Sequence, residues 1–169
     1  LIILRVRCVT AHWRNLSRSI RGCLVHWGLV HMNWPCFVVL SAPFACLCDS
    51  PDEYRKYPDI LKYLAEVPTS WDQTIPLAAR VGEYAVLAKQ KGNTWYIGGL
   101  NAWGERTIQV DCSFLPQDKK YTIEIFQDKK RSNKNANLYE HKIMDTDNKN
   151  IIEMFMASGG GFVMVIREK

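Results

Sequence analysis

The feature that most constrains the fold is a series of short β-rich runs from residue 80 onward, several of which alternate apolar and polar residues. Seven such runs follow one another: 81–90, 94–100, 106–112, 121–127, 139–144, 151–156 and 162–166. Turn residues separate them at a spacing of roughly ten residues. Alternation with a period of two is typical of strands, and no segment between the runs is long enough for a helical crossover. The sequence therefore predicts a mainly β fold, an antiparallel two-sheet β-sandwich of about seven strands over residues 80–169.

The alternation also indicates which side chains share a face of each strand. The positions expected on the apolar faces include Val86, Ala88, Ile108, Val110, Cys112, Tyr121, Ile123 and Ile125. Gly92 is expected in a tight hairpin connection, because glycine accepts a positive φ. The run Ser158–Gly161 lacks the lysine and the helix that a phosphate-binding loop requires, so it predicts a hairpin turn or a bulge.

Residues 37–65 predict a short helical segment in front of the sandwich. Pro51 is well placed to begin one helix, and Tyr57-Pro58 interrupts it. A second short helix is predicted over 59–65, with Ile60, Leu61 and Leu64 on one face. Residues 66–79 show neither a helical nor a strand period and are expected to form an ordered connector. Within this connector, we expect Trp71 to anchor the chain against a neighbouring surface.

The first 50 residues differ in composition from the rest of the chain. They hold five arginines, no lysine and a single acid, Asp49, together with five of the six cysteines. Residues 1–36 show no period, so we expect them to be irregular or poorly ordered; a shifted reading frame or a wrongly chosen start would produce such a stretch. The uncharged run 22–48 is interrupted by polar residues and by Pro35, which predicts neither a convincing signal peptide nor a membrane span. Lipid attachment at Cys46 is the remaining membrane alternative.

No group of residues assembles a nucleophile, a base and an oxyanion site, so the sequence predicts no catalytic residue and no metal site. The net charge of +5 is too weak to indicate a nucleic-acid partner. Asp128 and His141 are expected to be a solvated turn residue and a surface strand residue. The alternative is a carbohydrate-binding module, in which exposed rings form a platform for a sugar. Its candidate residues are Trp95, Tyr96 and Trp103.

Several short stretches, taken in order and spacing, resemble one known family. They are Glu66–Thr74, Val81–Tyr84, Lys91–Gly98 and Gly159–Phe162, and together they are similar to the C-terminal part of glycoside hydrolase family 97. Residues 41–44 and 49–54 are similar to the last helix and the exit of that family's catalytic (β/α)8 barrel. The resemblance covers about residues 37–169 and does not extend to 1–36.

The resemblance implies a truncated, non-catalytic β-sandwich of an α-glucosidase or α-galactosidase. Such a domain supports the catalytic barrel and oligomerisation, so the expected partners are the barrel of the parent enzyme and a second subunit. The resemblance places the catalytic carboxylates and a calcium ion in the barrel, which leaves this chain without a cofactor. It implies a periplasmic or secreted location. The side chains expected to pack between domains, and to face an absent barrel, are Ile60, Leu61, Leu64 and Trp71.

Overall fold

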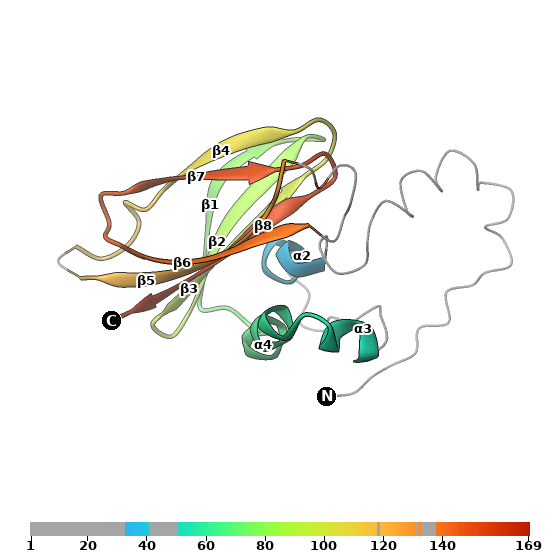
Figure 1. Ribbon diagram of the computed structural model, residues 1–169. Helices are drawn as coiled ribbons and strands as arrows, with labels where there is room; N and C mark the ends of the chain where they lie inside the picture. The colour runs from blue at the N-terminus through green and yellow to red at the C-terminus, as the bar shows by residue number, and fades with distance from the viewer. Residues whose placement is uncertain (1–32, 41–50, 118, 131, 133–137) are drawn as a thin grey trace, which may run out of the picture.

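The computed structural model describes residues 33–40, 51–117, 119–130, 132 and 138–169 (Figure 1). Within these residues it contains three helices and eight strands. The strands are β1 (Gln73–Arg80), β2 (Tyr84–Lys91), β3 (Thr94–Asn101), β4 (Arg106–Asp111), β5 (Tyr121–Asp128), β6 (Tyr139–Thr146), β7 (Ile151–Met156) and β8 (Gly161–Glu168). The predictions for residues 1–32 and for Cys46 lie outside the described part of the chain.

The strands form two sheets of unequal size. The larger has the order β1-β2-β3-β8-β5-β6, and the smaller consists of β4 and β7. Every neighbouring pair is antiparallel. This confirms the predicted mainly β, antiparallel two-sheet fold, and each of the seven predicted runs is a strand. The smaller sheet lies over one face of the larger one, which leaves the other face to the helices (Figure 1).

The eighth strand, β1, corrects the prediction of a connector over residues 66–79. It pairs with β2 from Gln73↔Gln90 to Arg80↔Tyr84, with a shift of register between Pro76 and Ala78. The strand lies at the edge of the sheet, where both of its faces are partly exposed. Ile75 and Leu77 alternate on the face that packs against the core, but Pro76 lies between them and the register shift follows directly, so the pattern is too short to predict a strand.

The main core lies between the two sheets. Its fully buried members come from the inward faces of both sheets, as the alternation predicts for Val86, Ala88, Val110, Ile123 and Ile125. Ile108 is half-buried and packs against the same cluster. Burial of this much aliphatic and aromatic surface, at roughly 25 cal/mol per Å2, is the main source of stability for such a domain.

Three helices precede the sandwich: α2 (Asn33–Val39), α3 (Pro51–Arg55) and α4 (Pro58–Glu66). The predicted helix start at Pro51 and the break at Tyr57-Pro58 are confirmed. The predicted boundary at residue 36 is wrong, because α2 begins at Asn33 and buries Trp34 and Val38 against the larger sheet. Residues on both sides of position 36 belong to this one helix, which needs the sheet to cover its apolar face.

Close backbone approach explains why α2 can lie directly on the sheet. A Cβ on Gly98 would stand only 2.8 Å from the Cβ of Val38 and 3.1 Å from the carbonyl oxygen of Pro35. A Cβ on Gly161 would lie 2.9 Å from the ring of Pro35. Two glycines, one on β3 and one on β8, therefore make the space in which the helix rests. The glycine-rich segment before β8 is a turn, with Gly159 at a φ of 70°, but it is not a hairpin, because β7 and β8 belong to different sheets.

Candidate functional site

The three aromatic residues proposed as a sugar platform point in different directions. Trp95 is 5% exposed and lies in the core between the sheets, where it packs edge-on against Phe114 at 4.9 Å. Tyr96 is 6% exposed and faces the opposite side of β3, under the helices. Only Trp103 is exposed, at 72%. Adjacent residues on a strand face opposite ways, so the platform prediction is wrong.

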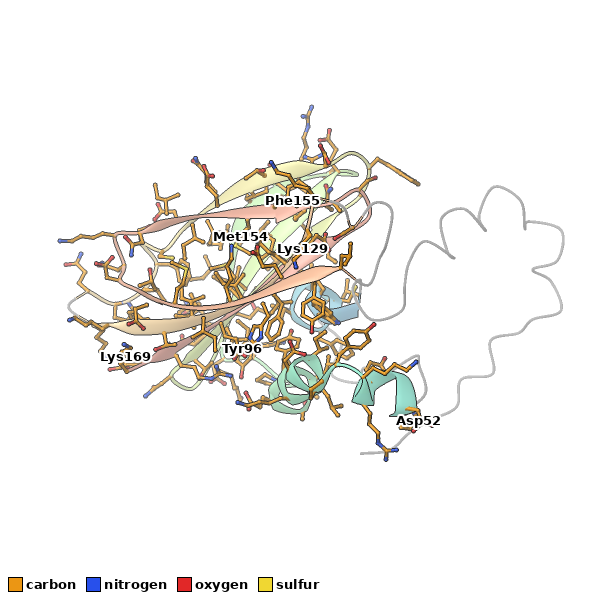
Figure 2. All side chains as sticks on the ribbon, in the orientation of Figure 1. Asp52, Tyr96, Lys129, Met154, Phe155 and Lys169 are labelled. Atoms are coloured by element: carbon orange, nitrogen blue, oxygen red, sulfur yellow. The ribbon has the colours of Figure 1, made fainter. Side chains whose placement is uncertain are left out.

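The helix-covered face of the larger sheet is the best-built candidate site in the described residues. Figure 1 shows α2 and α4 on this side, opposite the sheet formed by β4 and β7. A second apolar cluster fills the space between helices and strands, and Figure 2 shows Tyr96 on this side of the sheet. Its buried members are Trp34, Val38, Ile60, Tyr63, Tyr96, Phe126, Val163 and Val165.

The four residues expected to pack against an absent domain lie mostly within this cluster. Ile60 is 1% exposed, and Leu64 is half-buried against the same cluster. The ring of Trp71 packs edge-on against Tyr96 at 5.4 Å. Only Leu61 is exposed, at 37%. The expected large exposed patch is therefore absent at Ile60, Leu64 and Trp71, because the sandwich itself covers them.

Aromatic contacts hold α2 and α4 to the strands. Trp34 packs edge-on against Phe126 and Tyr139, with ring centroids 6.0 and 5.2 Å apart. Tyr63 packs against Phe126 at 5.7 Å and donates its hydroxyl proton to the Trp34 carbonyl oxygen at 3.1 Å. Edge-to-face pairs of this kind add attraction beyond the area they bury. Burial raises the pKa of the Tyr63 hydroxyl well above its ordinary value, so it acts as a neutral donor.

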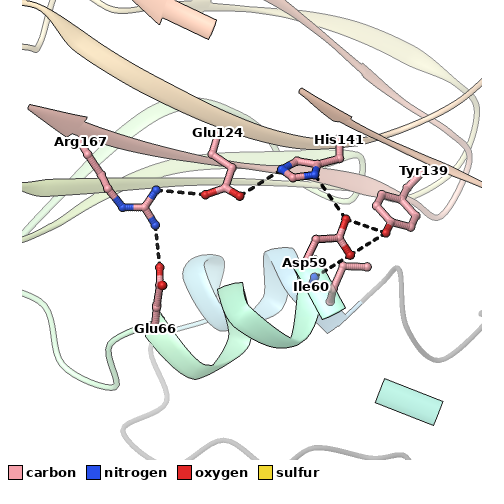
Figure 3. A network of polar contacts seen from close by, with 7 residues as sticks. All are labelled: Asp59, Ile60, Glu66, Glu124, Tyr139, His141 and Arg167. Carbon is pink, nitrogen blue, oxygen red and sulfur yellow. Dashed lines mark hydrogen bonds and ion pairs between the residues drawn. The ribbon is translucent and has the colours of Figure 1, made fainter. Parts of the chain in front are cut away.

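A chain of charged contacts surrounds this apolar cluster (Figure 3). Arg167 on β8 bridges two carboxylates, with 2.7 Å to Glu66 at the end of α4 and 3.0 Å to Glu124 on β5. Glu66 and Arg167 are 101 positions apart in the sequence. Glu124 is the more sheltered of the two carboxylates. A guanidinium suits such a bridge because its donors are held in a planar fork.

The chain of contacts continues from β5 to the start of α4. The imidazole of His141 lies 3.0 Å from Glu124 through Nε2 and 3.4 Å from Asp59 through Nδ1. Its ring is stacked on Phe126, with centroids 4.4 Å apart. Asp59 also accepts the hydroxyl proton of Tyr139 at 2.8 Å. The prediction that His141 is an ordinary surface residue misses this role.

Burial is the main cause that raises the pKa of Tyr139, and the hydrogen bond to Asp59 raises it further. The hydroxyl group of Tyr139 therefore stays protonated. Every charged side chain in this chain of contacts already faces an opposite charge or a donor from the same molecule. The arrangement therefore ties both ends of α4 to three strands, and it leaves no free nucleophile or base directed at a substrate.

A second polar site lies under the glycine-rich turn before β8. The carboxylate of Asp128 accepts the backbone N–H of Ala157 at 3.0 Å and that of Gly161 at 2.8 Å. Asp128 is buried, and burial raises its pKa to about 6 although both hydrogen bonds oppose the shift. The prediction of a solvated turn residue is wrong here. Its carboxylate instead stabilises the turn by accepting hydrogen bonds from residues on both sides of it.

The described residues contain no group of three or more His, Cys, Asp or Glu side chains that could hold a metal ion. Cys112 is buried, and burial raises the pKa of its thiol to about 11, so it is not an activated nucleophile. No helix in the described part of the chain is long and apolar enough to cross a membrane. Fold and site together define a β-sandwich module with helices packed on one face of its larger sheet.

The family is established by direct comparison. The model of the family described as "Glycosyl-hydrolase 97 C-terminal, oligomerisation" matches residues 70–167, and the chain belongs to this family. A retaining alpha-galactosidase of Bacteroides thetaiotaomicron is 38% identical over 131 residues, which cover 78% of this chain and 20% of that protein. A probable retaining alpha-galactosidase of Streptomyces bingchenggensis is 41% identical over 64 residues, 38% of this chain and 10% of that protein.

Solved structures agree with this family. A variant of a Glycoside Hydrolase Family 97 enzyme from Pseudoalteromonas sp. strain K8 superposes with a TM-score of 0.79 at 25% identity, covering 84% of this chain and 23% of that one. A beta-arabinopyranosidase shares the fold, with a TM-score of 0.63 at 21% identity over 79% of this chain and 20% of that one. The chain thus spans about a fifth of the length of these larger proteins.

Proposed function

We propose that this module serves an enzyme that hydrolyses α-galactosidic bonds, in which it supports a catalytic barrel and brings subunits together. The proposed substrate class is supported by the 38% identity to a retaining alpha-galactosidase over 131 residues. The family resemblance alone is compatible with both α-glucosides and α-galactosides as substrates. The names of the two curated relatives favour α-galactosides.

The outer side of the helices is the surface that we assign to the barrel. Leu61 on α4 and Leu40 at the end of α2 are exposed apolar side chains there. The inner sides of both helices are already bound to the sheet by the apolar cluster and by the Arg167 contacts. The helices would therefore act as a rigid adaptor between the sandwich and the barrel.

Location and cofactor follow from the same proposal. The curated relatives are bacterial, and we place the parent enzyme in the periplasm or outside the cell. The calcium ion that the family resemblance implies belongs to the barrel. The residues described here offer no cluster of three ligands for it.

A chimera tests the proposal. The catalytic part of the Bacteroides thetaiotaomicron relative would be joined to residues 33–169 of this chain in place of its own C-terminal part. We expect the chimera to be soluble and to hydrolyse an aryl α-galactoside within about tenfold of the parent rate, which corresponds to less than about 1.4 kcal/mol in activation free energy. Residues 33–169 alone should release no product. A soluble chimera without activity, or turnover by the chain alone, would contradict the proposal.

A further inference from the structure

The two edges of the larger sheet differ in how they are protected. The β1 edge carries Pro76 and a shift of register beside it, two devices that prevent another strand from adding to a sheet. The opposite edge, β6, pairs with β5 in an unbroken register over its whole length, from Tyr139↔Asp128 to Thr146↔Tyr121. No other described strand pairs with β6. Over residues 140–146 its outer side therefore presents a row of backbone N–H and C=O groups that no other described strand pairs with.

The side chains of β6 are also unusual for a free edge. Residues 141–145 are all exposed, and they include two large apolar side chains, Ile143 at 66% and Met144 at 41%. The charged neighbours are largely paired within the chain. Lys142 lies 3.0 Å from Glu140, and Asp145 lies 2.7 Å from Lys169. A regular edge that exposes two large apolar side chains, and whose charged side chains are largely paired within the same chain, is suited to strand addition.

We propose that β6 is the oligomer contact of this module and pairs antiparallel with β6 of a second copy. The proposal rests on the oligomerisation role that the family description gives, and it adds the surface and the register. A contact between identical edges obeys two-fold symmetry, so each residue meets a partner at a fixed sum of residue numbers. The shared sheet would then contain the six strands of each copy.

Charge selects the register. A two-fold axis at Lys142 would place two ammonium groups directly opposite each other, which is unfavourable in a cross-strand pair. An axis at Ile143 instead sets Ile143 against its own copy and Lys142 against Met144. It also places His141 opposite Asp145 of the second copy, so this register sets no two like charges directly opposite each other. This register overlaps 140–146 in both copies.

Crosslinking tests the register. Directly opposite residues in an antiparallel pair have Cα atoms about 4.5 to 5.5 Å apart, within the range of a disulfide. We expect Ile143→Cys to form a covalent dimer on mild oxidation, visible on a non-reducing gel. Thr74→Cys on β1 and Thr107→Cys on β4 are exposed strand positions at other edges and should stay at the level of the parent chain. The parent carries six cysteines and sets the background.

Sedimentation tests the contact without a crosslink. A contact made by one strand from each copy buries little surface area, so we expect a weak dimer with a dissociation constant on the order of micromolar. Ile143→Lys would place two like charges opposite each other and should weaken the dimer by about tenfold or more. Thr107→Lys adds the same charge to an exposed position on β4 and should leave the dimer unchanged. Circular dichroism would verify that both variants keep the β fold.

The possible outcomes test the β6 contact and the oligomerisation role separately. A dimer that survives Ile143→Lys, and that Ile143→Cys fails to crosslink, overturns the β6 contact but leaves oligomerisation by another surface. A chain that stays monomeric up to about 100 µM overturns both the contact and the ability of this module alone to assemble subunits. The α-galactoside assignment is tested by the chimera and is unaffected by either result.

Discussion

At the scale of single residues, Asp128 shows how a buried acid can organise a turn. Its carboxylate holds the backbone N–H groups on both sides of the glycine-rich turn, and its pKa is raised to about 6 by burial. A Cβ on Gly160 would overlap the same carboxylate, so glycine is required there. The backbone is thus packed directly against a side chain that titrates close to neutral pH.

This raised pKa predicts a specific dependence of stability on pH. The folded pKa lies above the ordinary value of 3.8, so the folded chain binds this proton more tightly than the unfolded chain does. The contribution of this bound proton to the stability of the folded chain is fully present below pH 4 and is lost as the pH rises through 6. Asp128→Asn keeps an oxygen acceptor but does not titrate. Urea unfolding at pH 4 to 7 should show the parent losing at most about 3 kcal/mol relative to Asp128→Asn over this range.

The outcome that contradicts this prediction is a constant difference between the two proteins across that range. Asp128→Ala serves as the control for the acceptor itself. It leaves two buried N–H groups without their partner, so it should be less stable than Asp128→Asn by about 2 kcal/mol or more at every pH, because neither variant titrates at this position.

Gly99 marks a second position where a side chain decides the packing. A Cβ there would overlap the ring of Phe162, which is fully buried on β8 and cannot move aside. We expect Gly99→Ala to lower the free energy of unfolding by about 1 to 3 kcal/mol through overpacking. In a Phe162→Leu background the same substitution should cost clearly less, since the overlapping ring is gone. Additive losses in the double variant would rule out the overlap as the cause.

At the scale of elements, the docking of α4 makes the most direct prediction. Ile60 is 1% exposed and Leu61, its neighbour on the same helix, is 37% exposed. Truncation of a buried isoleucine costs about 2 to 5 kcal/mol, so Ile60→Ala should fall in that range when measured by urea unfolding. Leu61→Ala is the matched control and should cost less than about 1 kcal/mol. Equal losses would mean that α4 is not packed on its Ile60 side.

Two kinds of strand could be predicted from the sequence: those with one buried and one exposed face, which alternate, and those buried on both faces, such as β8, which is a continuous apolar run. β4, for example, alternates Ile108 and Val110 with polar residues and was found where expected. β1 was not predicted, because only Ile75 and Leu77 alternate on its inner face and Pro76 stands between them. The register shift beside Pro76 removes the remaining pattern.

The candidate site was harder to predict than the strands, because its contacts join distant parts of the chain. Asp59 and His141 meet only once α4 rests on the sheet, and Glu66 meets Arg167 in the same way. No local pattern marks such pairs. The aromatic platform failed for a simpler reason, since Trp95 and Tyr96 are consecutive on a strand and face opposite sides.

At the scale of the whole molecule, the structural unit is larger than the segment that defines the family. The family model begins at residue 70, whereas the helices that cover the larger sheet begin at residue 33. A chain of residues 70–169 would expose the apolar face around Tyr96, Phe126, Val163 and Val165. We expect this shorter chain to aggregate or to bind a hydrophobic dye strongly.

The comparison chain is residues 33–169, which we expect to remain soluble and to unfold cooperatively. Light scattering and dye fluorescence at equal concentration would distinguish the two. A shorter chain that is equally soluble and equally stable would contradict the assignment of the helices to this folding unit.

The position of β8 has a further consequence for how the protein is made. β8 is the last strand along the described chain, yet it lies in the middle of the larger sheet and joins the β1-β2-β3 meander to the β5-β6 hairpin. While the ribosome still holds residues 161–168, those two pieces have nothing to connect them. The sheet can therefore close only after synthesis has passed this strand, and until then the apolar faces of the two nascent pieces stay uncovered.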